Sequence, residues 1–176
     1  SATHVDDATL AGADLGLTAE VIAAALRRDS FDLVVAGNQS TDGSAGMIPA
    51  MVAALLGLPV LTNLSSVDID DAMVTGTRST DDATTRVRAE LPAVISVTEQ
   101  LPDARFPNFK GIMAAKKKPV TVLTLGDLVI DADDLSVPRS IMLAVSERPP
   151  RAAGVKVVED GTAVTQLAAF LVENRL

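Results

Sequence analysis

The sequence contains no cysteine, no tryptophan and no tyrosine, and its 176 residues include one histidine and four phenylalanines. Without cysteine the chain has neither a disulfide framework nor a thiolate nucleophile. The single histidine, His4, lies near an end expected to be poorly ordered and has no evident partner, which argues against a Ser-His-Asp triad. The carboxylates occur in adjacent pairs rather than in a spaced cluster, which argues against a metal site. We therefore expect no catalytic side chains, and any redox chemistry must come from a bound cofactor.

Positive charge is also scarce. Lysine and arginine number 15 against 23 acidic residues, which gives a formal net charge of -8. The one basic cluster, at residues 116–118, is too short to form a broad basic face, so nucleic-acid binding is not expected. No apolar run reaches the roughly 20 residues of a transmembrane helix, and the first residues lack the features of a signal peptide. These features predict no membrane insertion and favour a cytoplasmic location.

The apolar residues are mainly valine, alanine, leucine and isoleucine, which is typical of buried parallel strands covered by helices. Their spacing predicts a helix over residues 18–28 with Thr18 as its N-cap, and a buried strand over 31–36. A helix over 47–56 and a strand over 59–64 follow, which completes a right-handed βαβ unit. We expect an α/β fold, in which a mostly parallel sheet has helices on both faces.

Three segments that alternate apolar and polar residues, 67–69, 73–77 and 85–89, predict a small antiparallel hairpin region. Further strands are expected at 93–97, 120–123 and 141–145, and further helices at 112–117 and 162–172. On this basis residues 1–130 form a nucleotide-binding α/β domain, and residues 131–176 form a linker and a C-terminal helical arm.

A polar, glycine-rich segment separates the predicted strand at 31–36 from the helix at 47–56. Glycines allow close backbone approach, and the N-terminus of the helix favours an anion, so this loop is a candidate phosphate site. It matches neither GxGxxG nor GxxxxGK[ST], and an ordinary turn stays open as the alternative. The candidate nucleotide-binding residues are Gly37, Asn38, Gln39, Ser40, Thr41, Asp42, Gly43, Ser44, Ala45, Gly46, Met47 and Ile48.

A second candidate site lies in the proline-containing segment 99–111 and the short helix after it. Two of the four phenylalanines occur here, and an exposed aromatic ring suits a partner surface. The alternative is that both rings fold back onto the sheet. The lysines after them either stabilise the end of the short helix or attract an acidic partner. The candidate docking residues are Arg105, Phe106, Phe109, Ile112, Met113, Lys116 and Lys117.

Three segments follow one another in a recognisable order: 37–43 (GNQSTDG), 90–97 (ELPAVISV) and 105–118 (RFPNFKGIMAAKKK). Together with 153–157 (AGVKV) and the terminal helix, they resemble the β subunit of electron transfer flavoproteins over essentially the whole chain. The resemblance implies a HUP-like adenine-nucleotide-binding fold with AMP as a structural ligand at residues 37–48. It further implies a flavin, FAD, held mainly by an α subunit and shared across the interface.

The same resemblance implies a heterodimeric electron carrier rather than an enzyme, which takes electrons from acyl-CoA or related dehydrogenases to an acceptor. Phe109 occupies the position of the family's docking anchor, and the terminal helix that of an arm around the α subunit. The compartment would be the bacterial cytoplasm or the mitochondrial matrix. Family chains extend further before the point that matches Ser1, so we expect a shortened chain or a companion segment that completes the sheet.

Two further hypotheses stay open. One is a stand-alone adenine-nucleotide-binding protein of the universal-stress type, which would use the same strand, loop and helix. The other is a β subunit that binds a second FAD and takes part in electron bifurcation. The glycine-rich loop by itself does not distinguish AMP from the ADP half of FAD.

Overall fold

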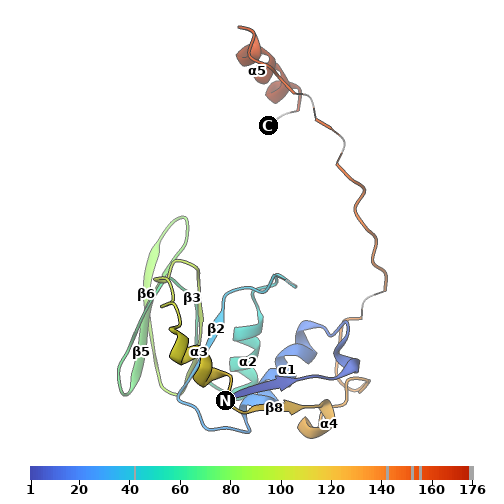
Figure 1. Ribbon diagram of the computed structural model, residues 1–176. Coiled ribbons are helices and arrows are strands. Elements are labelled where there is room, and N and C mark those ends of the chain that lie inside the picture. The colour runs from blue at the N-terminus through green and yellow to red at the C-terminus, as the bar shows by residue number, and fades with distance from the viewer. Residues whose placement is uncertain (42, 142, 152, 155, 175–176) are drawn as a thin grey trace. The chain divides into compact units, whose positions relative to one another are not determined.

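The computed structural model describes residues 1–41, 43–141, 143–151, 153–154 and 156–174, and it divides into two compact units, Ser1–Met142 and Leu143–Leu176 (Figure 1). The first unit holds two parallel sheets, an antiparallel sheet and helices, and the second holds a helix. The predicted α/β class is confirmed. The division at residue 130 into a nucleotide-binding domain and an arm stays a prediction. None of the described helices is long and apolar enough to cross a membrane.

The central sheet has three parallel strands in the order β2 (Leu33–Gly37), β7 (Ala93–Val97) and β3 (Val60–Leu64). Helix α2 (Ile48–Leu56) connects β2 to β3 and packs on β7 and β3. The predicted strand, loop and helix are therefore confirmed. However, β7 lies between the two strands of the βαβ unit, and its side chains are buried on both faces of the sheet.

A second layer covers the other face of β3 and β7. It is an antiparallel sheet of β4 (Ser66–Ile69), β5 (Met73–Ser79) and β6 (Thr84–Glu90), which confirms the predicted hairpin region. Apolar side chains from both sheets form one core between the layers. Its buried members are Leu61, Leu64, Val74, Ala93 and Ile95.

Helix α1 (Leu15–Leu26) begins three residues earlier than the sequence indicated, and Thr18 is not its N-cap. Asp14 occupies that position, and its Oδ1 accepts a hydrogen bond from the Leu17 amide at 2.8 Å. Thr18 lies in the first turn, where its hydroxyl donates to the Asp14 carbonyl. Two alanines of α1 allow close packing against α2, which lies beside it (Figure 1).

The first residues are ordered, contrary to expectation. Residues Ala2–Val5 form β1, which pairs in parallel with β8 (Val120–Leu123), so His4 lies within a strand. Asp7 joins two connections at this edge: its Oδ1 accepts from the Thr9 amide and its Oδ2 from the Leu125 amide. The first of these bonds caps the turn η1 (Ala8–Leu10), and the second reaches helix α4 (Leu125–Leu128).

Two predictions near the end of the first unit were wrong in detail. Helix α3 (Phe109–Ala115) starts before the predicted residue 112, because the Asn108 side chain accepts from the Gly111 amide at 2.7 Å and caps the helix there. The strand predicted at 141–145 is absent from its described residues, 141 and 143–145, while Met142 lies outside the described part. Alternating apolar residues form a strand only where a neighbouring strand accepts their backbone hydrogen bonds.

In the second unit, helix α5 (Ala163–Glu173) confirms the predicted terminal helix. Thr162 precedes it as expected but makes no capping bond; its hydroxyl instead donates to Asp160 and accepts from Gln166. Among its described residues the helix buries no side chain, and Val164, Leu167 and Phe170 are half or more exposed.

Gly76 offers a test of the core between the two sheets. A Cβ at this position would lie 2.5 Å from the Ser66 carbonyl oxygen and 2.9 Å from Leu64 Cδ1. We expect Gly76→Ala to lower the free energy of unfolding by about 1–3 kcal/mol, measured by urea denaturation. Gly126→Ala is the control, because a Cβ in α4 meets only an ordinary contact with Thr124 at 3.6 Å. Equal stability of the two variants would contradict this packing.

Candidate functional site

The glycine-rich loop lies between the end of β2 and the start of α2, as the sequence predicted. Two hydrogen bonds hold its described part: Gln39 Nε2 donates to the Ser44 carbonyl at 2.7 Å, and Ser44 Oγ donates to the Ser40 carbonyl at 3.2 Å. Gly46 has φ +64°, a left-handed conformation that glycine adopts without steric cost. Asp42, one of the predicted site residues, lies outside the described residues.

The N-terminus of α2 carries no side-chain cap. Met47 stands at the N-cap position without a capping bond, and Pro49 follows in the first turn, where no amide hydrogen is needed. Among the described residues, no acceptor receives the amide groups of Gly46, Met47 or Ile48. These amides, at the positive end of the helix dipole, suit an anion such as a phosphate.

A cavity of about 420 Å³ lies against the loop. The structure brings four predicted residues together at its wall: Ser40, Gly43, Ala45 and Ile48. The other described loop residues do not line it; these are Gly37, Asn38, Gln39, Thr41, Ser44, Gly46 and Met47. The opposite wall comes from residues that the sequence analysis missed, namely Ala13, Asp14, Leu15, Thr18 and Ser140. Only tertiary folding brings residue 140 beside residue 14.

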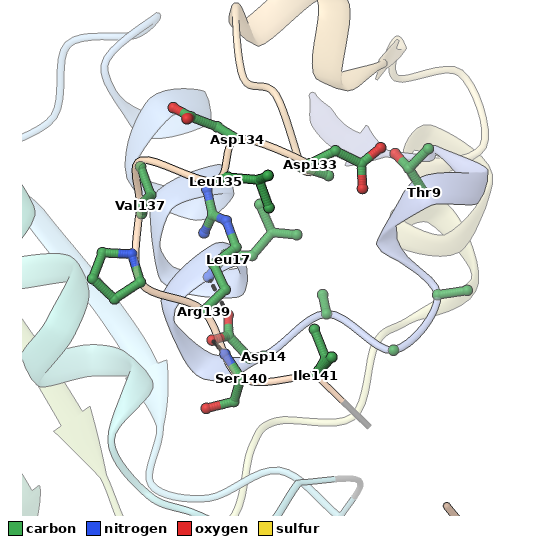
Figure 2. Close-up of a pocket in the computed structure, with 15 residues that line it drawn as sticks. Thr9, Asp14, Leu17, Asp133, Asp134, Leu135, Val137, Arg139, Ser140 and Ile141 are labelled. Carbon is green, nitrogen blue, oxygen red and sulfur yellow. Dashed lines mark hydrogen bonds between the residues drawn. The ribbon is translucent and has the colours of Figure 1, made fainter. Parts of the chain in front are cut away.

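Asp14 is the charged residue on the wall of the cavity that the sequence analysis did not predict. Hydrogen bonds from the amides of Leu17 and Ser140, with the nearby Arg139 guanidinium, hold the pKa of the Asp14 carboxyl below its usual range, so it is ionised at neutral pH. Asp14 also lines a second cavity of about 740 Å³, on the side of residues 132–141 (Figure 2). An Asp directly before a run of helix-forming residues is a recognisable N-cap signal. Its contact with Ser140 has no signal in the sequence.

The predicted docking residues surround the start of α3. Phe106 is 99% exposed and Phe109 is 78% exposed, so the alternative that both rings fold back onto the sheet is wrong. Phe109 is the first residue of α3, and Ile112 and Met113, three and four positions later, lie next to it on one helix face. Both are about two-fifths exposed. Exposed Arg105, Lys116 and Lys117 flank this apolar face at its two ends.

Comparison with known proteins places these features in a family. A family model described as the electron transfer flavoprotein domain matches residues 1–128. The chain is 43% identical over 178 aligned positions to the electron transfer flavoprotein subunit beta of Mycobacterium tuberculosis strain H37Rv, which covers 99% of the chain and 67% of that protein. The corresponding protein of Mycobacterium leprae is 40% identical with the same coverage.

More distant relatives show the same pattern. A Syntrophomonas wolfei electron transfer flavoprotein subunit beta is 32% identical over 90% of the chain and 60% of that protein. The chain therefore belongs to the electron transfer flavoprotein family, within the branch formed by the β subunits. This confirms the resemblance seen in the sequence and assigns the chain a role in electron transfer as one subunit of a flavoprotein.

The conformation of the glycine-rich loop can be tested at its two inner glycines. An alanine at position 46 must adopt the left-handed region, which costs about 1–2 kcal/mol, so Gly46→Ala should lower the free energy of unfolding by that amount. Gly43 has open space around its would-be Cβ and no positive φ, so Gly43→Ala should stay within about 0.5 kcal/mol of wild type. A Gly46→Ala variant as stable as Gly43→Ala would show that the loop does not need this turn.

Proposed function

We propose that this chain is the AMP-binding β subunit of a heterodimeric electron carrier, which docks on acyl-CoA or related dehydrogenases while FAD is held mainly by the α subunit. FAD supplies the electron-accepting chemistry when bound. The chain itself supplies binding surfaces rather than catalytic side chains. The observation that carries this proposal is the large apolar face around Phe109, which the first unit leaves in solvent next to cationic side chains.

The glycine-rich loop fits a nucleotide phosphate. The amides of Gly46, Met47 and Ile48 have no acceptor among the described residues, and the N-terminus of α2 adds its dipole. The loop contains no lysine or arginine, so the phosphate would rest on backbone donors. The adjoining cavity of about 420 Å³ lies within the usual range of about 300–1,000 Å³ for small-ligand sites. A mononucleotide such as AMP is the ligand that we favour.

A second FAD in place of AMP, with a bifurcating role, is the alternative. One relative is relevant to this alternative. The caffeyl-CoA reductase-Etf complex subunit CarD of Acetobacterium woodii is 27% identical over 97% of the chain. The name of that protein places it in a complex of a caffeyl-CoA reductase and an Etf. Measured nucleotide content separates the two ligands directly.

The exposed face of α3 supports a docking role. Burial of large exposed apolar side chains against a partner lowers the free energy of the complex. Aromatic residues are common anchors at such interfaces. Because Phe109, Ile112 and Met113 share one face, Phe109 is the centre of the proposed contact. The lysines at the end of α3 would attract an acidic rim on the partner and increase the rate of encounter.

Helix α5 supports the proposed contact with the α subunit. Its apolar side chains have no covering layer within the described part of the second unit. An amphipathic helix of this kind is stable when its apolar face lies in a groove of another chain. We infer that the α subunit provides that groove.

The cofactor assignment predicts a defined nucleotide content. Co-expression with the α subunit should give a yellow complex, from which acid extraction releases about one FAD and one AMP per heterodimer. Chromatography against nucleotide standards measures both. Two FAD and no AMP would favour the bifurcating alternative, and a colourless chain without nucleotide would refute the carrier proposal.

The docking face predicts unequal effects of two similar substitutions. Phe109→Ala should weaken dehydrogenase binding by about 1–3 kcal/mol and leave the flavin absorption spectrum unchanged. Phe106→Ala removes a ring that is even more exposed but lies before the helix, so its effect should be smaller. Steady-state reduction of the carrier at varied dehydrogenase concentration measures both. Equal kinetics in wild type and Phe109→Ala would exclude this anchor.

A further inference from the structure

We propose that Asp14 couples nucleotide binding to the anchoring of the segment that leads into the C-terminal arm. This segment, residues 138–141, is called the anchor segment below. The inference rests on the proposed nucleotide site at the glycine-rich loop and assigns a positioning role to a residue outside that loop.

Two contacts hold the anchor segment against α1. The Ser140 amide donates to Asp14 Oδ2 at 2.7 Å, and Arg139 Nη2 donates to Glu20 Oε2 at 2.7 Å (Figure 2 shows Asp14, Arg139 and Ser140). The Arg139 side chain is only 11% exposed, so its ion pair with Glu20 is more than a solvated surface contact. The described part of the segment belongs to no helix or strand, so these contacts hold it in place.

The same residues form a wall of the candidate nucleotide site. Asp14 and Ser140 line the cavity of about 420 Å³ that Ser40, Gly43, Ala45 and Ile48 line from the other side. Asp14 and Ser140 also line the neighbouring cavity of about 740 Å³, together with the rest of the anchor segment. The anchor segment thus borders two cavities, and one of them adjoins the loop. Release of the segment would open the nucleotide site on that side.

The coupling follows from this shared wall. A nucleotide that fills the smaller cavity contacts both the loop and Ser140, so it binds the anchored state more tightly than the released state. By linkage, the anchored segment must raise nucleotide affinity by the same factor. Asp14 connects the anchor segment to α1, because its other oxygen, Oδ1, caps α1 through the Leu17 amide.

The variant Asp14→Asn separates the anchor from simple electrostatics. Asparagine replaces one of the two accepting oxygens by an NH2 group, which cannot accept the amide of Leu17 or Ser140 that faces it. Loss of a negative charge near a phosphate would by itself strengthen AMP binding. Coupling predicts the opposite sign, an increase in the AMP dissociation constant of about fivefold or more.

Glu20→Gln tests the coupling from a residue that does not line the smaller cavity. It weakens the ion pair with Arg139, so it should also raise the AMP dissociation constant. Asp7→Asn is the matched control. Asp7 has the same double role, with a cap on Thr9 and a contact to Leu125, yet it does not line the smaller cavity, so AMP affinity should not change.

The experiment uses the full chain in complex with its α subunit, with AMP affinity measured by calorimetry after nucleotide removal and amide hydrogen exchange followed at residues 138–141. In wild type, AMP should slow exchange there; in Asp14→Asn and Glu20→Gln, exchange should be fast and less sensitive to AMP. Wild-type AMP binding with unchanged affinity and exchange in both variants would overturn the coupling and leave the proposed function intact. A wild-type complex that binds no AMP would overturn both.

Discussion

Burial of β7 between its neighbours is the constraint on which the described fold of the first unit depends. Ala93, Val94 and Ile95 are at most 1% exposed, because α2 covers one face of the central sheet and the antiparallel hairpins cover the other. This packing on both faces fixes the positions of β2 and α2 relative to each other, since both contact β7. The glycine-rich loop joins those two elements and is therefore held at one edge of a rigid core, where backbone amides can be kept in position for a ligand.

The charged side chains follow a consistent pattern around that core. Asp7 and Asp14 each use one carboxylate oxygen to start a helical turn and the other to hold a segment more than one hundred residues away. The hydrogen bond from the Thr9 hydroxyl, followed by those from the Thr9 and Leu125 amides, lowers the pKa of the Asp7 carboxyl, whereas the amides of Leu17 and Ser140 are the main causes that lower the pKa of Asp14. This acidic chain, which has no disulfides, thus uses carboxylates to hold together parts of its backbone that are far apart in the sequence.

The apolar residues divide into two populations with different roles. Those of β3, β5 and β7 face one another and form a closed core. Those of α3 and α5 stay in solvent among the described residues, although burial would be favourable. A subunit that forms one lasting interface and one transient docking contact needs such surfaces, which fits a carrier better than a stand-alone nucleotide sensor.

The sequence by itself determined most of the secondary structure, the α/β class, the position of the glycine-rich loop and the family. These depend on local spacing and on motifs of contiguous residues, as in residues 37–48 and 105–118. It placed the start of two helices too late, at Thr18 and at residue 112. The capping acceptors come instead from Asp14 and Asn108, and any polar residue near a helix start can supply one. It also missed β1, since a four-residue strand is defined by its partner β8. Only the tertiary structure decided that β7 lies between β2 and β3 and that Ser140 meets Asp14, because both contacts join residues far apart in a chain whose local pattern is the same either way.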